Sequence, residues 1–220
     1  MPSVATTLAG LKLRNPTMLA SGFLDETGGT LLRVFQAGAG AVVTKSIGPK
    51  PRAGNTNPTI LELDVGLLNA MGLPNPGMRD FGPEAKIALD GGAVVIGSVF
   101  GKDPDEYAGV AKALQGYGVH AIELNLSCPH AKGLGTEIAE DPEAVKEFTA
   151  AVKGKVKVPV MPKLSPNVSN IAAFAEAAED GGADAIVAIN TLKAMAIAPE
   201  LRTTVLANKV GGLSGPALRP

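Results

Sequence analysis

The chain has no tryptophan, and aromatic residues make up only 4% of its 220 residues. Proteins that stack nucleic-acid bases use aromatic side chains, so this composition argues against a base-binding surface. Basic and acidic residues are nearly balanced, 20 against 21. A clustered basic face is the usual mark of nucleic-acid binding, and the sequence does not predict one. We therefore expect no nucleic-acid partner.

Cysteine and histidine are also scarce. Cys128 is the single cysteine, and His120 and His130 are the two histidines. One cysteine allows no internal disulfide and no cysteine-based metal site, and we predict no bound metal. The sequence also has no uninterrupted apolar run of about 18 residues and no basic region followed by an apolar stretch at its start. We therefore expect a cytoplasmic protein with no membrane association.

The chain does contain an alternation of strand-like and helix-like segments. Six apolar runs predict strands, which begin at Thr17, Ala41, Ala93, Ala121, Val158 and Ala185. Helical patterns separate them, and such alternation is typical of a parallel sheet. A weak repeat, Gly-x-x-Ala-(Val/Ile), begins at Gly38, Gly118 and Gly182 and marks a helix end followed by a strand. These repeated units favour an α/β fold of the (β/α)8 TIM-barrel type over a doubly wound sheet.

The remaining segments complete this prediction. Residues 4–14 predict a hairpin, and helices are expected over 30–37, from Asn75 as N-cap to about 89, 104–116, 142–152 and from Asn167 or Ser169 to 178. An excursion rich in glycine, proline and asparagine covers 47–76, and we interpret it as a folded lid or pocket wall. A second excursion covers 191–215. A closed barrel needs eight strands, and six are found. Either the chain is a fragment of a longer protein, or the barrel is open and incomplete with exposed strand edges. We favour a fragment, and expect residues 1–220 to be one barrel domain that lacks its last two βα units.

Polar residues end five of the predicted strands: Ser21, Lys45, Asn125, Lys163 and Asn190. The carboxyl ends of barrel strands share one face, and active sites are built there. Two cations and two amides on that face suit a flat, anionic, carbonyl-rich ligand. Each residue also has a simpler interpretation: Lys45 alone is a solvated strand end, and Cys128 alone is a small buried apolar residue.

Seven stretches resemble class 1 dihydroorotate dehydrogenase, in that family's order and over nearly the whole chain. They are residues 15–22, 44–46, 68–77, 125–129, 163–167, 189–191 and 212–216. The resemblance implies an FMN-containing (β/α)8 barrel that oxidises (S)-dihydroorotate to orotate in the synthesis of pyrimidines and UMP. It also implies two further βα units and a flavin-phosphate region, of which only Gly215 is present. We expect the chain of 220 residues to hold FMN poorly.

The resemblance implies a role for individual residues. Cys128 would be the base that removes the proton from C5, the hydride would pass from C6 to FMN N5, and Lys45 would steady the reduced flavin and reach the substrate. The implied cofactor contacts are Ala20, Ser21, Lys45, Ser46, Asn125, Lys163, Ile189 and Gly215. The implied substrate contacts are Lys45, Asn69, Ala70, Met71, Gly72, Leu73, Asn125, Asn190 and Thr191. The loop 129–135, with Gly133 and Gly135 as hinges, would close over the substrate.

The resemblance also bears on partners. Residues 68–72 and 130–135 are more similar to the subclass that uses NAD through a second subunit, which carries FAD and an iron–sulfur cluster, than to the subclass that uses fumarate. A homodimeric core is expected. Three alternatives stay open: a related pyrimidine-reducing FMN barrel, a lyase or aldolase that forms a Schiff base on Lys163, and an inactive barrel fragment.

Overall fold

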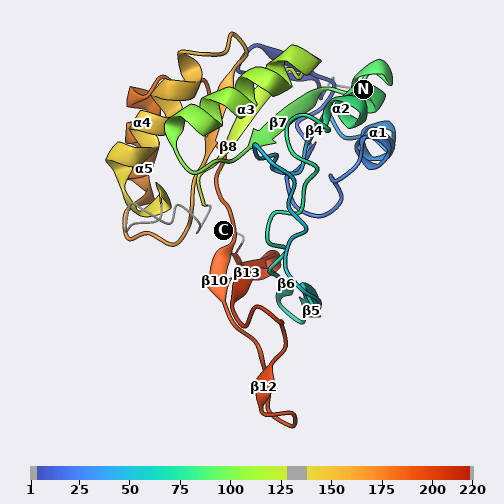
Figure 1. Cartoon of the computed structure of the whole chain (residues 1–220), viewed down its shortest axis with the longest axis vertical. Helices are drawn as coiled ribbons and strands as arrows, with labels where there is room; N and C mark the ends of the chain where they lie inside the picture. Colours follow the sequence, from blue (N-terminus) through green and yellow to red (C-terminus); the bar gives the residue numbers. More distant parts are fainter. Residues whose placement is uncertain (1–3, 128–137, 219–220) are drawn as a thin grey trace.

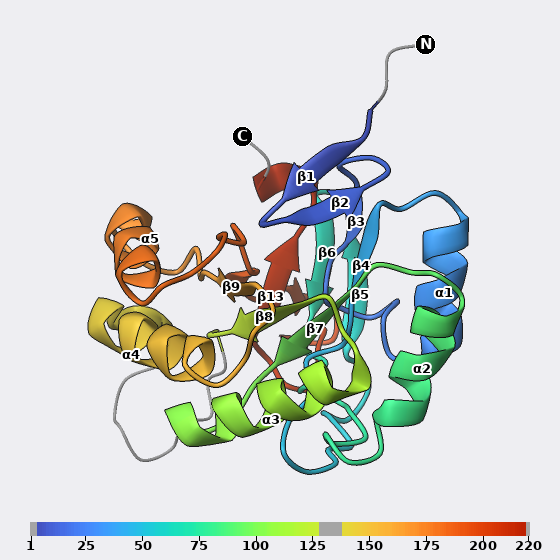
Figure 2. The ribbon, with the colours of Figure 1, turned by 90° about the horizontal axis from the view of Figure 1, so that it is seen from above.

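A parallel sheet of five strands forms the centre of the computed structural model, which describes residues 4–127 and 138–218. Its strands stand in the order β3 (Met18–Leu19), β4 (Ala41–Val43), β7 (Val95–Val99), β8 (Ala121–Asn125) and β9 (Val160–Lys163). The helices are α1 (Gly28–Gln36), α2 (Gly82–Asp90), α3 (Pro104–Tyr117), α4 (Pro142–Lys153) and α5 (Ile171–Asp180), with a short turn η1 (Ile138–Glu140) before α4. They form an arc around the outside of the strands (Figure 2). The sheet and its helices, here called the half-barrel, confirm the predicted barrel-type fold.

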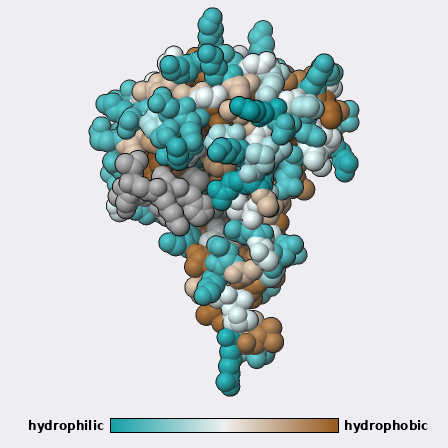
Figure 3. All heavy atoms as spheres, in the orientation of Figure 1, coloured by the Kyte–Doolittle hydropathy of each residue, from teal (hydrophilic) through white to brown (hydrophobic). Residues whose placement is uncertain are grey.

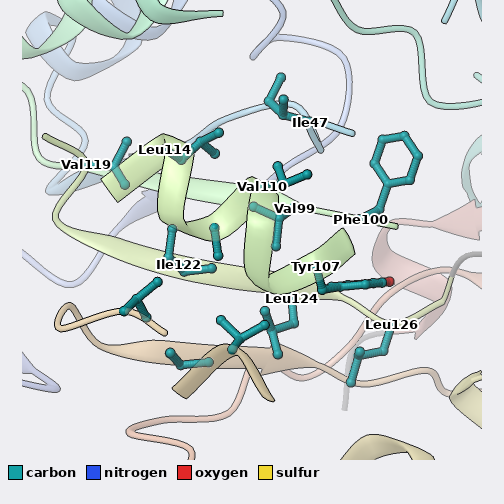
Figure 4. Packing of buried hydrophobic residues seen from close by; sticks show 14 of the residues in the cluster. Ile47, Val99, Phe100, Tyr107, Val110, Leu114, Val119, Ile122, Leu124 and Leu126 are labelled. Carbon is teal, nitrogen blue, oxygen red and sulfur yellow. The ribbon is translucent and has the colours of Figure 1, made fainter. Parts of the chain in front are cut away.

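Two hydrophobic cores lie on opposite faces of the sheet, because side chains alternate along a strand. The outward residues join the larger core under the helices; Val110 and Leu114 of α3 pack there with Ile122 of β8 (Figure 4). The inward residues form a second cluster: Ala41, Val43, Ile96, Ala121 and Met161, together with Leu13. Leu13 belongs to the predicted hairpin, β1 (Thr6–Leu8) and β2 (Leu11–Leu13). The hairpin therefore packs on the inner face of the half-barrel.

The helix ends follow local chemistry where the sequence supplies it. Asp103 and Asp141 each accept a hydrogen bond from a backbone N–H of the first turn, at 2.8 and 3.0 Å, which confirms both predicted starts. Gly38, Gly118 and Gly182 have φ of 126°, 98° and 87°. These values favour glycine and explain why the repeat has glycine there.

Two predicted N-caps are wrong because tertiary contacts use the side chains. The Oδ1 of Asn75 accepts from the N–H groups of Gly48 and Gly77, and helix α2 begins only at Gly82. The Nδ2 of Asn167 donates to Ser165 Oγ at 3.0 Å and to the Thr191 carbonyl at 3.1 Å. Helix α5 instead begins after Asn170, which makes no side-chain cap, so Ser169 is not the cap either.

The predicted sixth strand, 185–190, is not a regular strand. It lies parallel to β9 through a single bridge between Lys163 and Val187, where Val187 N–H donates to the Pro162 carbonyl at 2.9 Å. In parallel pairing, the N–H and C=O of one residue face the same neighbour. Pro162 has no N–H, so one ladder hydrogen bond on this side of β9 cannot form.

Both excursions fold into a projecting arm, defined here as residues 52–74 and 191–215. Its antiparallel sheet has the order β10 (Leu192–Ala194), β13 (Gly211–Ser214), β6 (Gly66–Asn69) and β5 (Ile60–Leu63). Beyond it, β11 (Ile197–Ala198) pairs with β12 (Thr203–Thr204), and a turn, η2 (Pro216–Leu218), follows the arm. The arm extends away from the half-barrel in Figure 1, and apolar side chains are visible on its surface in Figure 3. The prediction that 47–76 is folded is confirmed.

None of the helices within residues 4–127 and 138–218 has the length and apolar character needed to cross a membrane.

Candidate active site

A cavity of about 470 Å³ lies at the carboxyl edge of the half-barrel, where the arm meets it. All five predicted strand-tip residues line it, so the prediction that they converge is confirmed: Ser21, Lys45, Asn125, Lys163 and Asn190. Ser46 lines it too, and the arm contributes Asn69, Ala70, Met71, Gly72, Leu73 and Thr191. Ala20, Ile189 and Gly215 are not among the lining residues. Cys128 and the loop 129–135 lie outside the residues that the structure describes.

Lys45 enters the cavity from a buried position after β4, with only 5% of its surface exposed. Its Nζ donates to the Gly22 carbonyl, and its backbone N–H donates to the Asp25 carbonyl at 3.0 Å. Burial lowers the pKa of Lys45, and the negative charge of Asp25 opposes that shift. Burial raises the pKa of Asp25, opposed by the N–H of Gly22 and by Lys45. Each group therefore favours the charged form of the other and opposes the effect of burial on its pKa.

Lys163 stands at the end of β9, opposite Asn125 of β8 in the sheet register. It is 6% exposed, and Glu123, two residues before Asn125, is 2% exposed. Burial raises the pKa of the Glu123 carboxyl, and the charge of Lys163 and a hydrogen bond from Ser98 oppose this. Two buried lysines at the cavity thus face two buried carboxyl groups, and the opposite charges offset part of the cost of burial.

Hydrogen bonds tie the two amides of the site together. The Nδ2 of Asn125 donates to Ser46 Oγ at 3.0 Å, and the Nδ2 of Asn190 donates to Asn125 Oδ1 at 3.2 Å. The Tyr107 hydroxyl donates to the Asn125 carbonyl at 2.6 Å and fixes the end of β8 from the helix side. These contacts hold the amides in one orientation before any ligand is bound.

Several residues of the site were not predicted from the sequence. Glu123 had a usable signal, because it alternates with Asn125 and therefore points to the same face of β8. Asp25, by contrast, lies in a loop after β3, and nothing in its neighbourhood indicates burial. Lys193 reaches the cavity from β10, which pairs with β13, and Asn208 reaches it from the segment between β12 and β13.

The residues present fit a flavin. A cavity of about 470 Å³ falls in the range of small-molecule sites. Its hydroxyl, amide and lysine donors suit the carbonyl and ring-nitrogen edge of such a group. Ser127 Oγ is buried and has no hydrogen-bond partner among the described residues, and Ser127 lines the cavity. A bound ligand edge would supply that missing partner.

Fold and site together define a parallel βα-barrel protein with a polar site, lined by two buried lysines and two hydrogen-bonded amides, at the carboxyl ends of its strands. Comparison with known proteins gives the family. The family model described as dihydroorotate dehydrogenase matches residues 3–220. The chain is 54% identical over 211 residues to the catalytic subunit of dihydroorotate dehydrogenase B (NAD(+)) from Methanocella arvoryzae, and 53% identical over 220 residues to that from Thermoplasma volcanium. The chain belongs to the dihydroorotate dehydrogenase family, which is flavin-dependent.

The matches cover 96% and 100% of this chain but 69% and 72% of those two relatives. A solved structure of DHODH from Eimeria tenella in complex with ferulenol has a TM-score of 0.79 and 22% identity, and the match covers 98% of this chain and 66% of that one. This likeness supports the fold alone. The alternatives of a Schiff-base lyase on Lys163 and of an inactive fragment receive no support from these relatives.

Proposed function

We propose that the chain is the catalytic part of an enzyme that oxidises (S)-dihydroorotate to orotate in pyrimidine biosynthesis, with FMN as its flavin. One observation carries the proposal: Lys45, Lys163 and the paired amides converge in one cavity. The relatives that share about half of the chain's sequence are named for this activity.

The residues of the cavity match this substrate. Dihydroorotate is an anion with ring N–H and C=O groups, and an asparagine side chain offers both a donor and an acceptor to such a ring. Asn69 from the arm and Asn125 and Asn190 from the half-barrel would bind it. Lys45 and Lys163 would hold the flavin and offset negative charge at the site. Bound flavin supplies the two-electron acceptor that oxidation of a carbon–carbon single bond requires.

Proton removal from C5 is assigned to Cys128. This role is a prediction from the family resemblance, and Cys128 follows directly on Ser127, which lines the cavity. The thiolate is the reactive form, and an unperturbed thiol has a pKa of about 8.5. Turnover should therefore rise with pH through the range in which the thiol ionises.

The relatives are named as catalytic subunits of an NAD(+) enzyme, so a second subunit belongs to the proposal. That subunit would carry FAD and an iron–sulfur cluster and pass electrons to NAD, and the catalytic chains would form a homodimeric core. A cluster needs several cysteine ligands, and this chain has one cysteine. The proposed compartment is the cytoplasm.

The proposal is tested by offering dihydroorotate and dihydrouracil separately to the protein in a saturating concentration of FMN, with an artificial electron acceptor. We expect oxidation of dihydroorotate and little of dihydrouracil, which lacks the carboxylate. Preference for dihydrouracil would favour the related pyrimidine-reducing barrel. Trapping of a substrate on Lys163 by borohydride would contradict the proposal.

A further inference from the structure

A continuous chain of hydrogen bonds joins the cavity to a buried carboxyl group beneath it. It passes from Asn190 to Asn125 at 3.2 Å and from Asn125 to Ser46 at 3.0 Å. It continues from Ser46 to Ser98 at 3.0 Å and ends where Ser98 Oγ donates to Glu123 Oε1 at 2.9 Å. Ser98 and Glu123 stand directly opposite each other on β7 and β8 and are 0% and 2% exposed.

Counting protons shows which group donates and which accepts in each of these hydrogen bonds. The hydroxyl of Ser98 donates to Glu123 Oε1, so the single proton of Ser98 is used toward Glu123. Ser46 must then donate to Ser98, and the oxygen of Ser46 is left to accept from an N–H of Asn125. The oxygen of Asn125 accordingly turns toward Asn190.

The other end of the chain imposes the same direction. The backbone N–H of Thr191 donates to Asn190 Oδ1 at 2.9 Å, so Asn190 must present its NH₂ group to Asn125. The donor end lies at the start of the arm and the acceptor end in the half-barrel. The donors and acceptors assigned from the Glu123 end therefore agree with those assigned from the Thr191 end.

We propose that Glu123 is a positioning residue, the terminal acceptor that holds Ser46 and Asn125 in the donor–acceptor orientation that the pyrimidine ligand meets. This inference rests on the proposed function, because it takes an orotate-like ring as the ligand. Glu123 would act through Ser98 and Ser46 and would not touch the ligand itself.

Burial has the largest effect on the Glu123 carboxyl and raises its pKa. Lys163 on the neighbouring strand β9 favours the charged form, and Asp25, from the loop after β3, acts weakly in the opposite sense. Replacing Glu123 therefore changes two things at once. It removes the terminal acceptor of the hydrogen-bond series, and it changes the carboxyl group that faces Lys163. The test has to separate them.

Calorimetry with orotate, on the protein in a saturating concentration of FMN, separates them through three single variants and one double variant. Glu123→Gln removes the ionisable carboxyl but keeps an acceptor oxygen, and Glu123→Met removes both. We expect Glu123→Met and Ser98→Ala each to weaken orotate binding about tenfold, the size of one hydrogen bond. Glu123→Gln should recover most of that loss, and the double variant Glu123→Met with Ser98→Ala should be no weaker than either single one, because both cut the same chain.

Thr149→Val is the matched control. Thr149 is a fully buried hydroxyl in α4 that donates to the Val145 carbonyl, away from the cavity, so this variant should bind orotate like the unsubstituted protein. Equal losses in Glu123→Gln and Glu123→Met, or additive losses in the double variant, would overturn the inference. Unchanged affinity in Ser98→Ala would overturn it as well.

A second readout needs no ligand. In protein labelled with ¹⁵N-asparagine, the side-chain NH₂ signals of Asn125 and Asn190 should shift in Ser98→Ala and stay in place in Thr149→Val. Signals unmoved by Ser98→Ala would overturn the inference. If the unsubstituted protein binds no orotate, the proposed function fails, and these signals still decide whether Glu123 positions the amides.

Discussion

The half-barrel and the arm line the same cavity, but they are held together differently. The half-barrel has parallel strands under helices, and its cavity lysines, Lys45 and Lys163, are at most 6% exposed. In the arm, Leu68 and Leu206 are the buried hydrophobic residues among those described, and Leu201 is 75% exposed. The buried charges of the site are thus built on the well-packed region, and the arm adds amides, backbone groups and the exposed Lys193.

This division follows from the free-energy cost of burial. A buried charge is tolerated only when its partners are fixed in place, which a close-packed core ensures. An amide is neutral and tolerates a less rigid setting, so Asn69 can stand on the small sheet of the arm. We therefore expect changes in the half-barrel to affect chemistry and global stability, and changes in the arm to affect ligand affinity.

The largest effect is expected from Lys45→Met. It removes the positive charge offered to the ligands and leaves Asp25 buried without its partner cation. Loss of one preorganised electrostatic group typically costs about 10²- to 10³-fold in kcat, and we expect a loss in that range by steady-state kinetics with dihydroorotate. Lys50→Met, at an exposed lysine, is the control and should retain full activity.

Leucine truncation should separate the two regions by stability. Leu124 and Leu68 are both 0% exposed, but only Leu124 belongs to the large core under the helices. Leu124→Ala should lower the free energy of unfolding by about 2–5 kcal/mol in a denaturant titration. Leu68→Ala should chiefly speed hydrogen exchange in β5, β6 and β13 and leave the global transition nearly unchanged. Equal global losses would show that arm and half-barrel unfold as one unit.

A smaller effect is expected from Asn69→Ala in the arm. Its Nδ2 donates to the Gly212 carbonyl at 3.3 Å, so the side chain is held at the cavity wall. Loss of a neutral hydrogen bond to the ligand should raise KM for dihydroorotate about five- to tenfold, with kcat little changed. Asn57→Ala, an exposed asparagine of the same arm, is the control. A loss confined to kcat would contradict the role given to the arm.

The smallest effect concerns pH. Burial raises the pKa of Glu123, so the folded protein binds that proton more tightly than the unfolded chain does. The resulting stability is complete below the ordinary glutamate pKa of about 4.3 and is lost as the pH rises through the raised value. The Tm of the wild type minus that of Glu123→Gln should therefore fall with rising pH. A constant difference would contradict this, and Glu62→Gln, at an exposed position, provides the baseline.

Much of the half-barrel could be predicted because its signals are local. Asp103-Pro104 and Asp141-Pro142 set helix starts, and apolar runs with polar ends mark the strands that deliver Lys45 and Asn125. The prediction of Asn75 as a helix N-cap is wrong because its side chain accepts a hydrogen bond from Gly48, which is far away in sequence. A local pattern carries no information about such a contact.

The site, too, could be predicted where its residues lie at strand ends, and could not be predicted where distant segments pair. Strand tips share one edge in any parallel barrel, so the convergence of Lys163 and Asn190 followed from strand order alone. The pairing of β6 with β13 joins residues more than 140 positions apart, and no sequence pattern gives that register. The contribution of Gly212 to the cavity, and the burial of Asp25, therefore emerged only from the structure.

The central claim is that this cavity brings a flavin and dihydroorotate together. Its most direct test is the visible spectrum of the protein in a saturating concentration of FMN during anaerobic addition of dihydroorotate. We predict that the flavin absorbance is bleached in proportion to the dihydroorotate added, and that orotate appears in equal amount. A spectrum that dihydroorotate leaves unchanged, while a chemical reductant bleaches it, would contradict the account.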